Sequence, residues 1–253
     1  VQLTRYASSV SNARWSLDGK SIFFLQGGQL YKAPLKGSKL GRKEKLSDVK
    51  EGIDEFKLSP DQSQILYTST IKNNLLQGPQ DVDSRLDKAQ AYITEDMMYR
   101  HWDHWTQTTP RTYVGTLCNG TLTVERSLDL LGTEPYELPT EPFGGIEQLD
   151  WAPDGRHIVY SCRKHMGKEY AFSTNCGIYI YDILTGATLS VQTDGGYDTD
   201  PVGSPDGSHI AWISMARDGY EADAQRIMVV DVEYETAQDG QCFGLNCGAP
   251  CEL

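Results

Sequence analysis

The sequence has 253 residues, of which 39% are hydrophobic, and this suffices for one large all-β domain or two domains of ordinary size. Its 23 basic and 35 acidic residues give a formal charge of -12, which argues against nucleic acid or an anionic membrane as the main partner. No apolar run reaches the ~18 residues that a membrane-spanning helix requires, so we expect no membrane span.

Four related segments recur along the chain. They are ARWSLDGKSIFFLQ (13–26), FKLSPDQSQILYTS (56–69), LDWAPDGRHIVYSC (149–162) and DPVGSPDGSHIAWIS (200–214). A Pro-Asp-Gly-like turn suits a hairpin, because Pro presets φ, Asp fits the next position and Gly adopts the left-handed conformation. The run after each turn alternates, as in Ile158 and Tyr160, so large side chains share one face. The pattern predicts hairpins of half-buried strands.

The spacing of these turns predicts the architecture. The turn aspartates Asp18, Asp61, Asp154 and Asp206 are 43, 93 and 52 residues apart, so we expect a degenerate unit in the longest interval. Further strand patterns follow at 28–35, 176–186 and 225–233, and a short helix is expected only at 81–92. Each unit thus has about four strands over roughly 40 to 50 residues, the period of a propeller blade. We predict an all-β propeller of four-stranded blades with TolB/WD-like repeats, about five blades in an incomplete ring.

The propeller is expected to span residues 1–233, with Trp15, Trp151 and Trp212 in the blade cores. Residues 234–253 continue no blade pattern. We therefore expect a separate Cys-rich tail there, non-native or disordered, and we expect the chain to be a fragment of a longer protein.

The cysteines leave two alternatives open. Cys162 and Cys176 end one predicted strand and begin the next, so they could form a disulfide across a hairpin or remain buried free thiols. Cys242, Cys247 and Cys251 have spacings that match no paired CxxC zinc pattern. We predict no metal site and no cofactor.

The segment AYITEDMMYRHWDHWTQTTPRTYVGTL (91–117) breaks the repeat and has three interpretations. As a metal site it would use His101, Asp103 and His104, but alternation along a strand would put His104 on the opposite face from the other two. As an ordinary blade strand it would bury Trp102 and Trp105.

The third interpretation is a binding rim. Here Glu95, Asp96 or Asp103 faces a cavity and accepts a ligand ammonium, and an aromatic side chain forms an apolar wall. In the blade interpretation, Arg100 instead satisfies Asp103 or a backbone carbonyl.

The same segment, together with PVGSPDGSHIAWISMARDGYEADAQRIMVVDVE (201–233), resembles the N-terminal propeller of the prolyl oligopeptidase family of serine peptidases. The bacterial dipeptidyl and acylaminoacyl peptidase-like branch is the most similar. The resemblance implies a propeller that caps an α/β-hydrolase domain with a Ser, Asp and His triad, and that admits only short peptides. The motif VGSPDG (202–207) lies in a turn between strands and is no Gly-x-Ser-x-Gly elbow, so we assign no catalytic residue.

A charged loop, MARDGYEAD (215–223), interrupts the last repeat, and it is either a solvated loop or a surface that faces the hydrolase domain or a substrate amine. In related exopeptidases, acidic propeller residues hold the amino terminus of the substrate. The predicted substrate-binding residues are Glu95, Asp96, Arg100, Trp102, Asp103, Arg217, Glu221 and Asp223.

The sequence therefore predicts the non-catalytic, substrate-gating propeller of a dipeptidyl peptidase-like serine exopeptidase. Its partners would be short peptides and a C-terminal hydrolase domain absent from this chain, and it could form a homo-oligomer. We expect a bacterial periplasmic or extracellular location. One alternative is a TolB-like periplasmic propeller that binds a protein partner. Another is a metal-dependent lyase or lactonase that uses His101 and Asp103.

Overall fold

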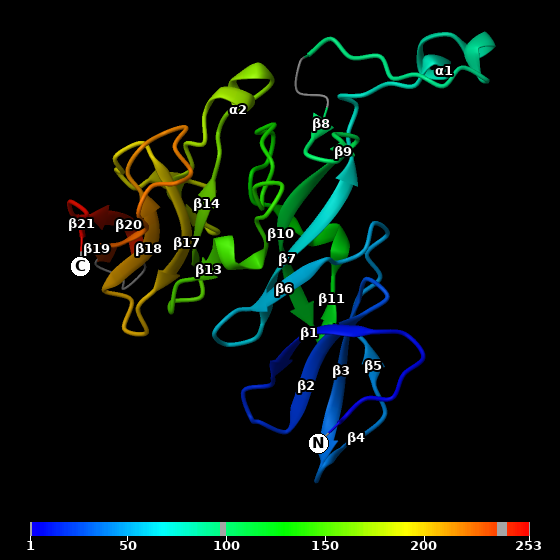
Figure 1. Ribbon diagram of the computed structural model, residues 1–253. Helices are drawn as coiled ribbons and strands as arrows, with labels where there is room; N and C mark the ends of the chain where they lie inside the picture. Colours follow the sequence, from blue (N-terminus) through cyan, green and yellow to red (C-terminus); the bar gives the residue numbers. More distant parts are fainter. Residues whose placement is uncertain (1, 97–99, 237–241, 253) are drawn as a thin grey trace.

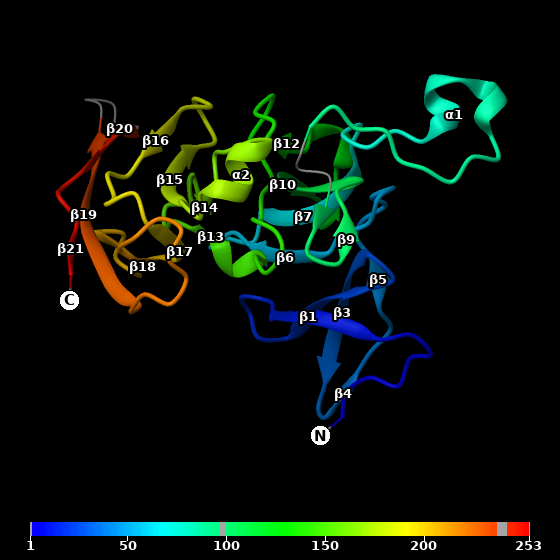
Figure 2. The same ribbon diagram turned by 45° about the horizontal axis from the view of Figure 1, so that its top comes forward.

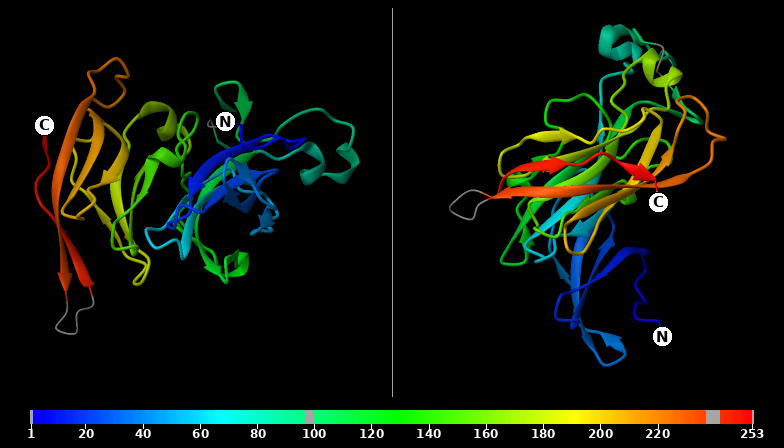
Figure 3. Two further views of the ribbon diagram at one scale, coloured as in Figure 1. Left: turned by 90° about the horizontal axis from the view of Figure 1, so that it is seen from below. Right: turned by 90° about the vertical axis from the view of Figure 1, so that its left-hand side faces the viewer.

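The computed structural model describes residues 2–96, 100–236 and 242–252. Within them, four large antiparallel sheets follow one another along the chain and form an open arc, with the first and last sheets at its two ends (Figures 1 and 2). Figure 3 shows from two further sides that the C-terminal sheet lies apart from the N-terminal one. The all-β propeller architecture with four-stranded blades is therefore confirmed.

The strands of each sheet run in chain order, as in a propeller blade. Blade one contains β1 (Val10–Trp15), β2 (Ser21–Gln26), β3 (Gln29–Lys36), β4 (Lys39–Leu40) and β5 (Glu44–Lys45). Blade two contains β6 (Glu55–Leu58), β7 (Gln64–Lys72), β10 (Thr108–Cys118), β11 (Thr121–Leu122) and β12 (Leu128–Asp129). Blade three contains β13 (Leu149–Trp151), β14 (His157–Cys162), β15 (Gly177–Asp182) and β16 (Thr188–Ser190). Blade four contains β17 (Tyr197–Gly203), β18 (His209–Met215), β19 (Arg226–Thr236), β20 (Cys242–Cys247) and β21 (Cys251–Glu252).

Short helices and one small hairpin occupy the connections. They are α1 (Pro79–Val82), η1 (Ser84–Leu86), β8 (Arg100–His101), β9 (His104–Trp105), η2 (Val124–Arg126), η3 (Ile146–Gln148) and α2 (Lys168–Phe172). The short helix expected at 81–92 thus corresponds to α1 and η1. No helix among the described residues is long and apolar enough to cross a membrane.

The prediction of about five blades needs correction, because the described residues form four blade sheets. The long interval between Asp61 and Asp154 contains no further blade in the described part of the chain. It contains instead an excursion of blade two, residues 73–107, between β7 and β10, and the connection 130–148 from blade two to blade three.

The predicted separate tail also needs correction. Strand β20 pairs with β19, with Val232 opposite Cys247, and β21 pairs with β19 through Val229 and Cys251. The described residues after 233 therefore complete blade four. The remainder of that prediction, residues 237–241 and 253, lies outside the described residues.

The alternation predicted from the sequence places side chains between neighbouring blades. In β14, Ile158 and Tyr160 pack toward blade two, whereas Val159 packs with Ile210 and Trp212 of blade four. A third cluster joins blades one and two around Phe23, Phe56 and Tyr67. Blades two and three thus bury both of their faces against a neighbour, as stacked blades do.

The three tryptophans predicted in the core do not share one environment. Trp151 and Trp212 are buried, but Trp15 is 57% exposed. Trp15 lies opposite Ile22 and Trp151 lies opposite Ile158, so the two occupy equivalent places. Blade two covers Trp151, whereas no described sheet covers the corresponding face of blade one.

The predicted disulfide is replaced by two buried free thiols, the alternative that the sequence left open. Cys162 lies opposite Gly177 across β14 and β15, so Cys176 faces the other side of the sheet. Burial raises the pKa of both thiols.

The four repeated turns lie at one end of the blades, which we call the turn end. In three of them a serine hydroxyl donates to the turn aspartate: Ser16 to Asp18 at 2.7 Å, Ser59 to Asp61 at 2.7 Å, and Ser204 to Asp206 at 2.5 Å. In the third repeat Ala152 replaces the serine, and the Asp154 carboxylate instead contacts His157 Nδ1 at 2.6 Å. These contacts satisfy the turn carboxylates within the turns themselves.

The opposite end carries the connections between the second and third strands of each blade, and we call it the loop end. Blade one needs only Gly27 and Gly28 there, both with positive φ. Blades two, three and four insert residues 73–107, 163–176 and 216–225. In Figure 1 these insertions, with α1, the β8–β9 hairpin and α2, lie above the blades. Loops held on a rigid scaffold commonly form binding sites.

Candidate functional site

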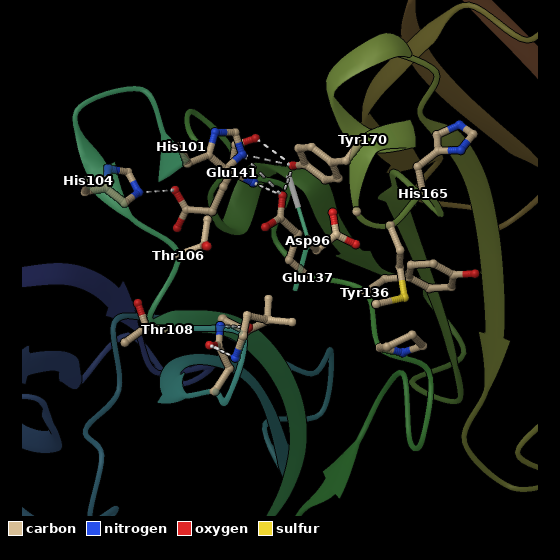
Figure 4. Close-up of a pocket in the computed structure, with 16 residues that line it drawn as sticks. Asp96, His101, His104, Thr106, Thr108, Tyr136, Glu137, Glu141, His165 and Tyr170 are labelled. Atoms are coloured by element: carbon tan, nitrogen blue, oxygen red, sulfur yellow. Dashed lines mark hydrogen bonds and ion pairs between the residues drawn. The ribbon is translucent and has the colours of Figure 1, made fainter. Parts of the chain in front are cut away.

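A small cavity of about 100 Å³ lies at the loop end between the β8–β9 hairpin, residues 135–141 and α2. Figure 4 shows the imidazole rings of His101 and His104 on one side and the Tyr170 ring on the other, with Glu137 between them. The cavity is large enough for a few waters or a small polar group.

The hairpin brings the two histidines together. Residues 102 and 103 form its turn, and Trp102 adopts a positive φ of 48°, which bulky side chains rarely adopt. His101 and His104 are therefore paired across β8 and β9, with ring centroids 6.1 Å apart. The expectation that alternation would separate them is wrong, because the chain reverses between them.

The tryptophans of this hairpin are not in a blade core. Trp102 is 70% exposed and Trp105 is 43% exposed. Trp102 packs edge-on against Phe143, with ring centroids 4.6 Å apart. The interpretation of residues 100–105 as an ordinary blade strand is therefore replaced by a surface hairpin.

Glu137 is a buried carboxyl at the centre of this arrangement. Its Oε1 contacts the Tyr170 hydroxyl and accepts a hydrogen bond from the Glu141 backbone N–H at 2.7 Å. His101 Nε2 lies 3.2 Å from the same Tyr170 hydroxyl. Burial raises the pKa of Glu137 to about 8, so this side chain is mostly uncharged at neutral pH.

The Tyr170 hydroxyl also lies 3.0 Å from the Glu141 carbonyl oxygen. A phenol has one hydroxyl proton. If it donates that proton in a hydrogen bond to the carbonyl, the phenol oxygen can accept a hydrogen bond from a protonated Glu137. An uncharged Glu137 therefore satisfies the whole arrangement. Burial lowers the pKa of His101, and the nearby Arg163 and His104 lower it further.

Glu141 presents the second carboxyl of the cavity. Its side chain is 31% exposed, and its Oε2 lies 3.8 Å from His104 Nε2. Unlike the Glu137 side chain, the Glu141 side chain is accessible from both the cavity and the solvent. Among the groups that line the cavity, Glu141 is therefore suited to bind a cationic ligand as a carboxylate.

Arg111 fixes the connection that carries both glutamates. Its guanidinium binds the two carboxylate oxygens of Asp129 at 2.9 and 2.8 Å. It also donates to the carbonyl oxygens of Gly132, Glu134 and Tyr136 at 2.9, 2.7 and 2.8 Å. A buried arginine in blade two thus positions the backbone immediately before Glu137.

A larger cavity of about 600 Å³ adjoins the small one and shares His101, Glu141 and Tyr170 with it. The volume lies within the ~300 to 1,000 Å³ that is typical of small-molecule sites. Its lining includes several exposed aromatic side chains from the insertions of blades two, three and four and from the connection 130–148: Trp102, Phe143, Phe172 and Tyr220.

The loop of blade four is fastened to blade three across this second cavity. The Asp218 carboxylate accepts hydrogen bonds from Ser173 Oγ at 2.8 Å and from the backbone N–H groups of Thr174 and Asn175 at 2.7 and 3.0 Å. Gly219 N–H in turn donates to Thr174 Oγ1 at 2.8 Å. These bonds hold the rim that carries Phe172 and Tyr220.

The chain is similar to curated proteins named dipeptidyl-peptidase 5. It is 41% identical to the one from Porphyromonas gingivalis over 234 residues, which is 91% of this chain and 34% of the relative. It is 37% identical to the one from Porphyromonas endodontalis over 232 residues, which is 90% of this chain and 33% of the relative. The chain thus spans about a third of the length of these relatives.

This similarity is consistent with an N-terminal propeller of a prolyl oligopeptidase-family peptidase. The fold of this chain matches an acylaminoacyl peptidase solved in complex with Z-Gly-Gly-Phe-chloromethyl ketone, with a TM-score of 0.55 and 14% identity. It also matches the Pyrococcus horikoshii acylaminoacyl peptidase, with a TM-score of 0.54 and 15% identity. Each match covers 96% of this chain and 38% of the other. No protein-family model matches the sequence.

The propeller brings together some of the residues predicted from the sequence. Asp96 lines the small cavity, and Arg100, Trp102 and Glu221 line the larger one. All four are exposed, in keeping with a rim.

Other predicted residues lie elsewhere or bind one another. Glu95 is exposed and lines neither of the two cavities, and the Asp103 side chain is 90% exposed and contacts His104 Nδ1 at 3.2 Å. Arg217 and Asp223 form an ion pair at 3.1 Å within their own loop. No group of three or more His, Cys, Asp or Glu residues in the described part of the chain is placed to hold a metal ion.

Sequence reasoning missed four residues at the centre of the site: Glu137, Glu141, Arg163 and Tyr170. The stretch EPYELPTEPF (134–143) offered one signal, because two glutamates four residues apart stand among prolines outside any strand pattern. Arg163 and Tyr170 had no local signal, since they join the site only when blade three packs beside the hairpin.

Proposed function

We propose that this propeller selects peptide substrates for a dipeptidyl peptidase-like serine exopeptidase, with the acyl-transfer chemistry carried by a hydrolase domain outside this chain. The similarity to dipeptidyl-peptidase 5 over nine-tenths of the chain supports a role in releasing dipeptides from free amino ends. The loop-end site, in which the solvent-reachable Glu141 carboxylate lies beside a small cavity, is the observation that carries the proposal.

In this proposal the substrate's terminal ammonium group enters the small cavity and binds the Glu141 carboxylate. A cavity of about 100 Å³ accommodates an ammonium group. Neighbouring His101 has a lowered pKa and is mostly neutral at pH 7, so it does not repel the ammonium. Asp96 at the cavity edge adds further negative charge.

Glu137 has a different part in the proposal. Because it holds a proton at neutral pH, it contributes hydrogen bonds rather than charge. Its contacts with Tyr170 and the Glu141 backbone N–H orient the segment from which Glu141 projects. We therefore assign the amine anchor to Glu141, in place of Asp103, whose side chain is almost fully exposed.

The test compares the binding of a free-amine peptide with that of its N-acetylated form, measured by titration calorimetry on the full chain. A charge-assisted hydrogen bond is worth ~1.5 to 3 kcal/mol, so Glu141→Gln should weaken binding of the free-amine peptide about tenfold to a hundredfold. The acetylated peptide should bind the variant and the parent alike.

Glu125→Gln is the matched control, because Glu125 is an exposed glutamate on η2 outside both cavities. This variant should bind both peptides as the parent chain does. Equal losses for both peptides in Glu141→Gln, or no loss for either, would refute Glu141 as the amine anchor.

A further inference from the structure

Arg163 is a cavity-lining arginine that forms no ion pair within the described part of the chain. It follows β14 and lines the larger cavity. Its guanidinium lies over the Tyr170 ring, 4.4 Å from the centroid, and its buried Nε has no hydrogen-bond partner among the described residues. No described acid forms an ion pair with it. A buried N–H without an acceptor is costly, which points to an acceptor supplied by a ligand.

The nearby acid does not supply the missing charge. Glu137 is close enough for Arg163 to influence its ionisation, but its raised pKa of about 8 keeps it mostly protonated at neutral pH. His101 also lies close to Arg163 and is a base, so it offers no compensating charge. A guanidinium in this position favours a planar oxygen acceptor, because its N–H groups form a fork that matches carboxylate and carbonyl oxygens.

The surroundings of Arg163 fit a peptide residue. The cavity of about 600 Å³ has room for a side chain, and Trp102, Phe143, Phe172 and Tyr220 form apolar walls. It adjoins the small cavity through Tyr170, whose ring contacts Arg163 and whose hydroxyl reaches the Glu141 carbonyl. A peptide anchored at Glu141 therefore passes directly into the cavity that Arg163 lines.

We propose that the larger cavity is a second peptide subsite, in which Arg163 donates hydrogen bonds to an oxygen acceptor of the substrate while the aromatic rim covers the adjoining side chain. This inference rests on the proposed function, since it takes the ligand to be a peptide. The acceptor is either an acidic side chain or a backbone carbonyl, and the two sources predict different specificity.

The experiment measures affinities of free-amine tripeptides for the full chain and its Arg163→Met variant by titration calorimetry. The peptides form matched pairs, with glutamate or glutamine at the first or the second position. If the acceptor is a side-chain carboxylate, the variant should lose about tenfold or more for the glutamate member only. If it is a backbone carbonyl, both members should lose affinity alike. Unchanged affinity for every peptide overturns the inference.

A direct readout accompanies the titration. The Nε–Hε signal of Arg163 in a ¹H–¹⁵N spectrum, assigned by its disappearance in Arg163→Lys, should shift when the peptide is added. Arg163→Lys keeps the charge without the fork, so its affinity should be intermediate. Arg42→Met removes an exposed arginine of blade one and should bind as the parent does. A static Arg163 signal at saturating peptide contradicts the inference.

The two proposals fail separately. If Glu141→Gln weakens binding and Arg163→Met does not, the second subsite is refuted and the amine anchor stands. If Arg163→Met weakens binding and Glu141→Gln does not, the amine anchor is refuted and the subsite stands. Thermal unfolding of Arg163→Met shows whether it is folded, and Arg163→Lys provides the affinity comparison if it is not.

Discussion

The two ends of the blades use similar residue types for opposite purposes. At the turn end, Asp18, Asp61 and Asp206 accept hydrogen bonds from serines and backbone N–H groups within their own turns, and these bonds lower their pKa values. At the loop end, burial raises the pKa of Glu137, and Arg163 Nε has no hydrogen-bond partner among the residues that the structure describes. Groups satisfied locally stabilise the fold, whereas groups left partly unsatisfied are available to a ligand.

The difference follows from chain length between strands. A four-residue turn with Asp and a following residue of positive φ, which is Gly in three blades and Gln62 in blade two, closes on itself and repeats wherever a blade begins. The connections 73–107, 134–143 and 163–176 are longer and come from different blades, so their side chains meet only after the blades have packed. The comparison predicts that substitutions at the turn end change stability alone, and that substitutions at the loop end change binding as well.

The largest expected effect comes from two arginines, one near each end. Arg111 binds Asp129 beside the site at 2.9 and 2.8 Å. Arg156 binds Asp182 near a turn at 2.7 and 2.6 Å. Replacing either by Met leaves a partly buried carboxylate unpaired, so each variant should lose about 3 to 5 kcal/mol of unfolding free energy in urea titrations.

Peptide affinity separates the two variants. Arg111→Met should weaken free-amine peptide binding, because the segment before Glu137 loses its three carbonyl contacts. Arg156→Met should bind peptide normally at temperatures where it is folded. Normal binding by Arg111→Met would refute the proposal that Arg111 positions the binding site.

The next effect concerns pH. The pKa of Glu137 is about 8 in the folded chain against 4.5 for a free side chain, because burial disfavours the charged form. Between these values the folded state keeps a proton that the unfolded state releases, so rising pH favours unfolding. Relative to Glu137→Gln, the parent chain should lose up to about 1.4 kcal/mol of stability per pH unit in this window.

Urea titrations at several pH values measure this difference. The parent's extra stability should be complete below pH 4.5 and lost as the pH rises through 8. Other titrating groups contribute equally to both proteins and cancel in the comparison. Parallel pH profiles for the two chains would show that Glu137 ionises normally.

The smallest effect is expected at the turn end. Asp61→Ala removes an acceptor for Ser59 and Ser63. The exposed Ser63 can turn to water, whereas the buried Ser59 hydroxyl loses its acceptor. The loss of unfolding free energy should be about 1 to 2 kcal/mol. Peptide affinity, measured in the same titration as for Glu141→Gln, should be unchanged. A loss of binding would indicate that the ligand contacts the turn end instead of the loop end.

The sequence predicted the turn end well because its signals are local and periodic. The Pro-Asp-Gly turns located the hairpins, and alternation assigned Ile158, Tyr160 and Trp212 to the core, where they are buried. The prediction for Trp15 was wrong because burial there depends on a neighbouring sheet. Local alternation cannot indicate whether such a neighbour is present.

The loop end was predicted only in part. The segment around RHWDHW contributes residues to both cavities, and of the residues predicted from the sequence Asp96, Arg100, Trp102 and Glu221 line them. The reversal at Trp102, which pairs His101 with His104, was not predicted because no glycine marks that turn. Contacts such as His101 with Tyr170 join residues far apart in sequence, and periodicity carries no information about them.

The most direct test of the central claim maps where a free-amine peptide binds, by following backbone amide shifts of the full chain during a titration. We predict shifts confined to the loop end, in residues 100–109, 134–143, 163–176 and 215–223, with the Asp-Gly turns unaffected. Shifts centred on the turns at 16–20, 59–63, 152–157 or 204–208, with none at the loop end, would contradict the account.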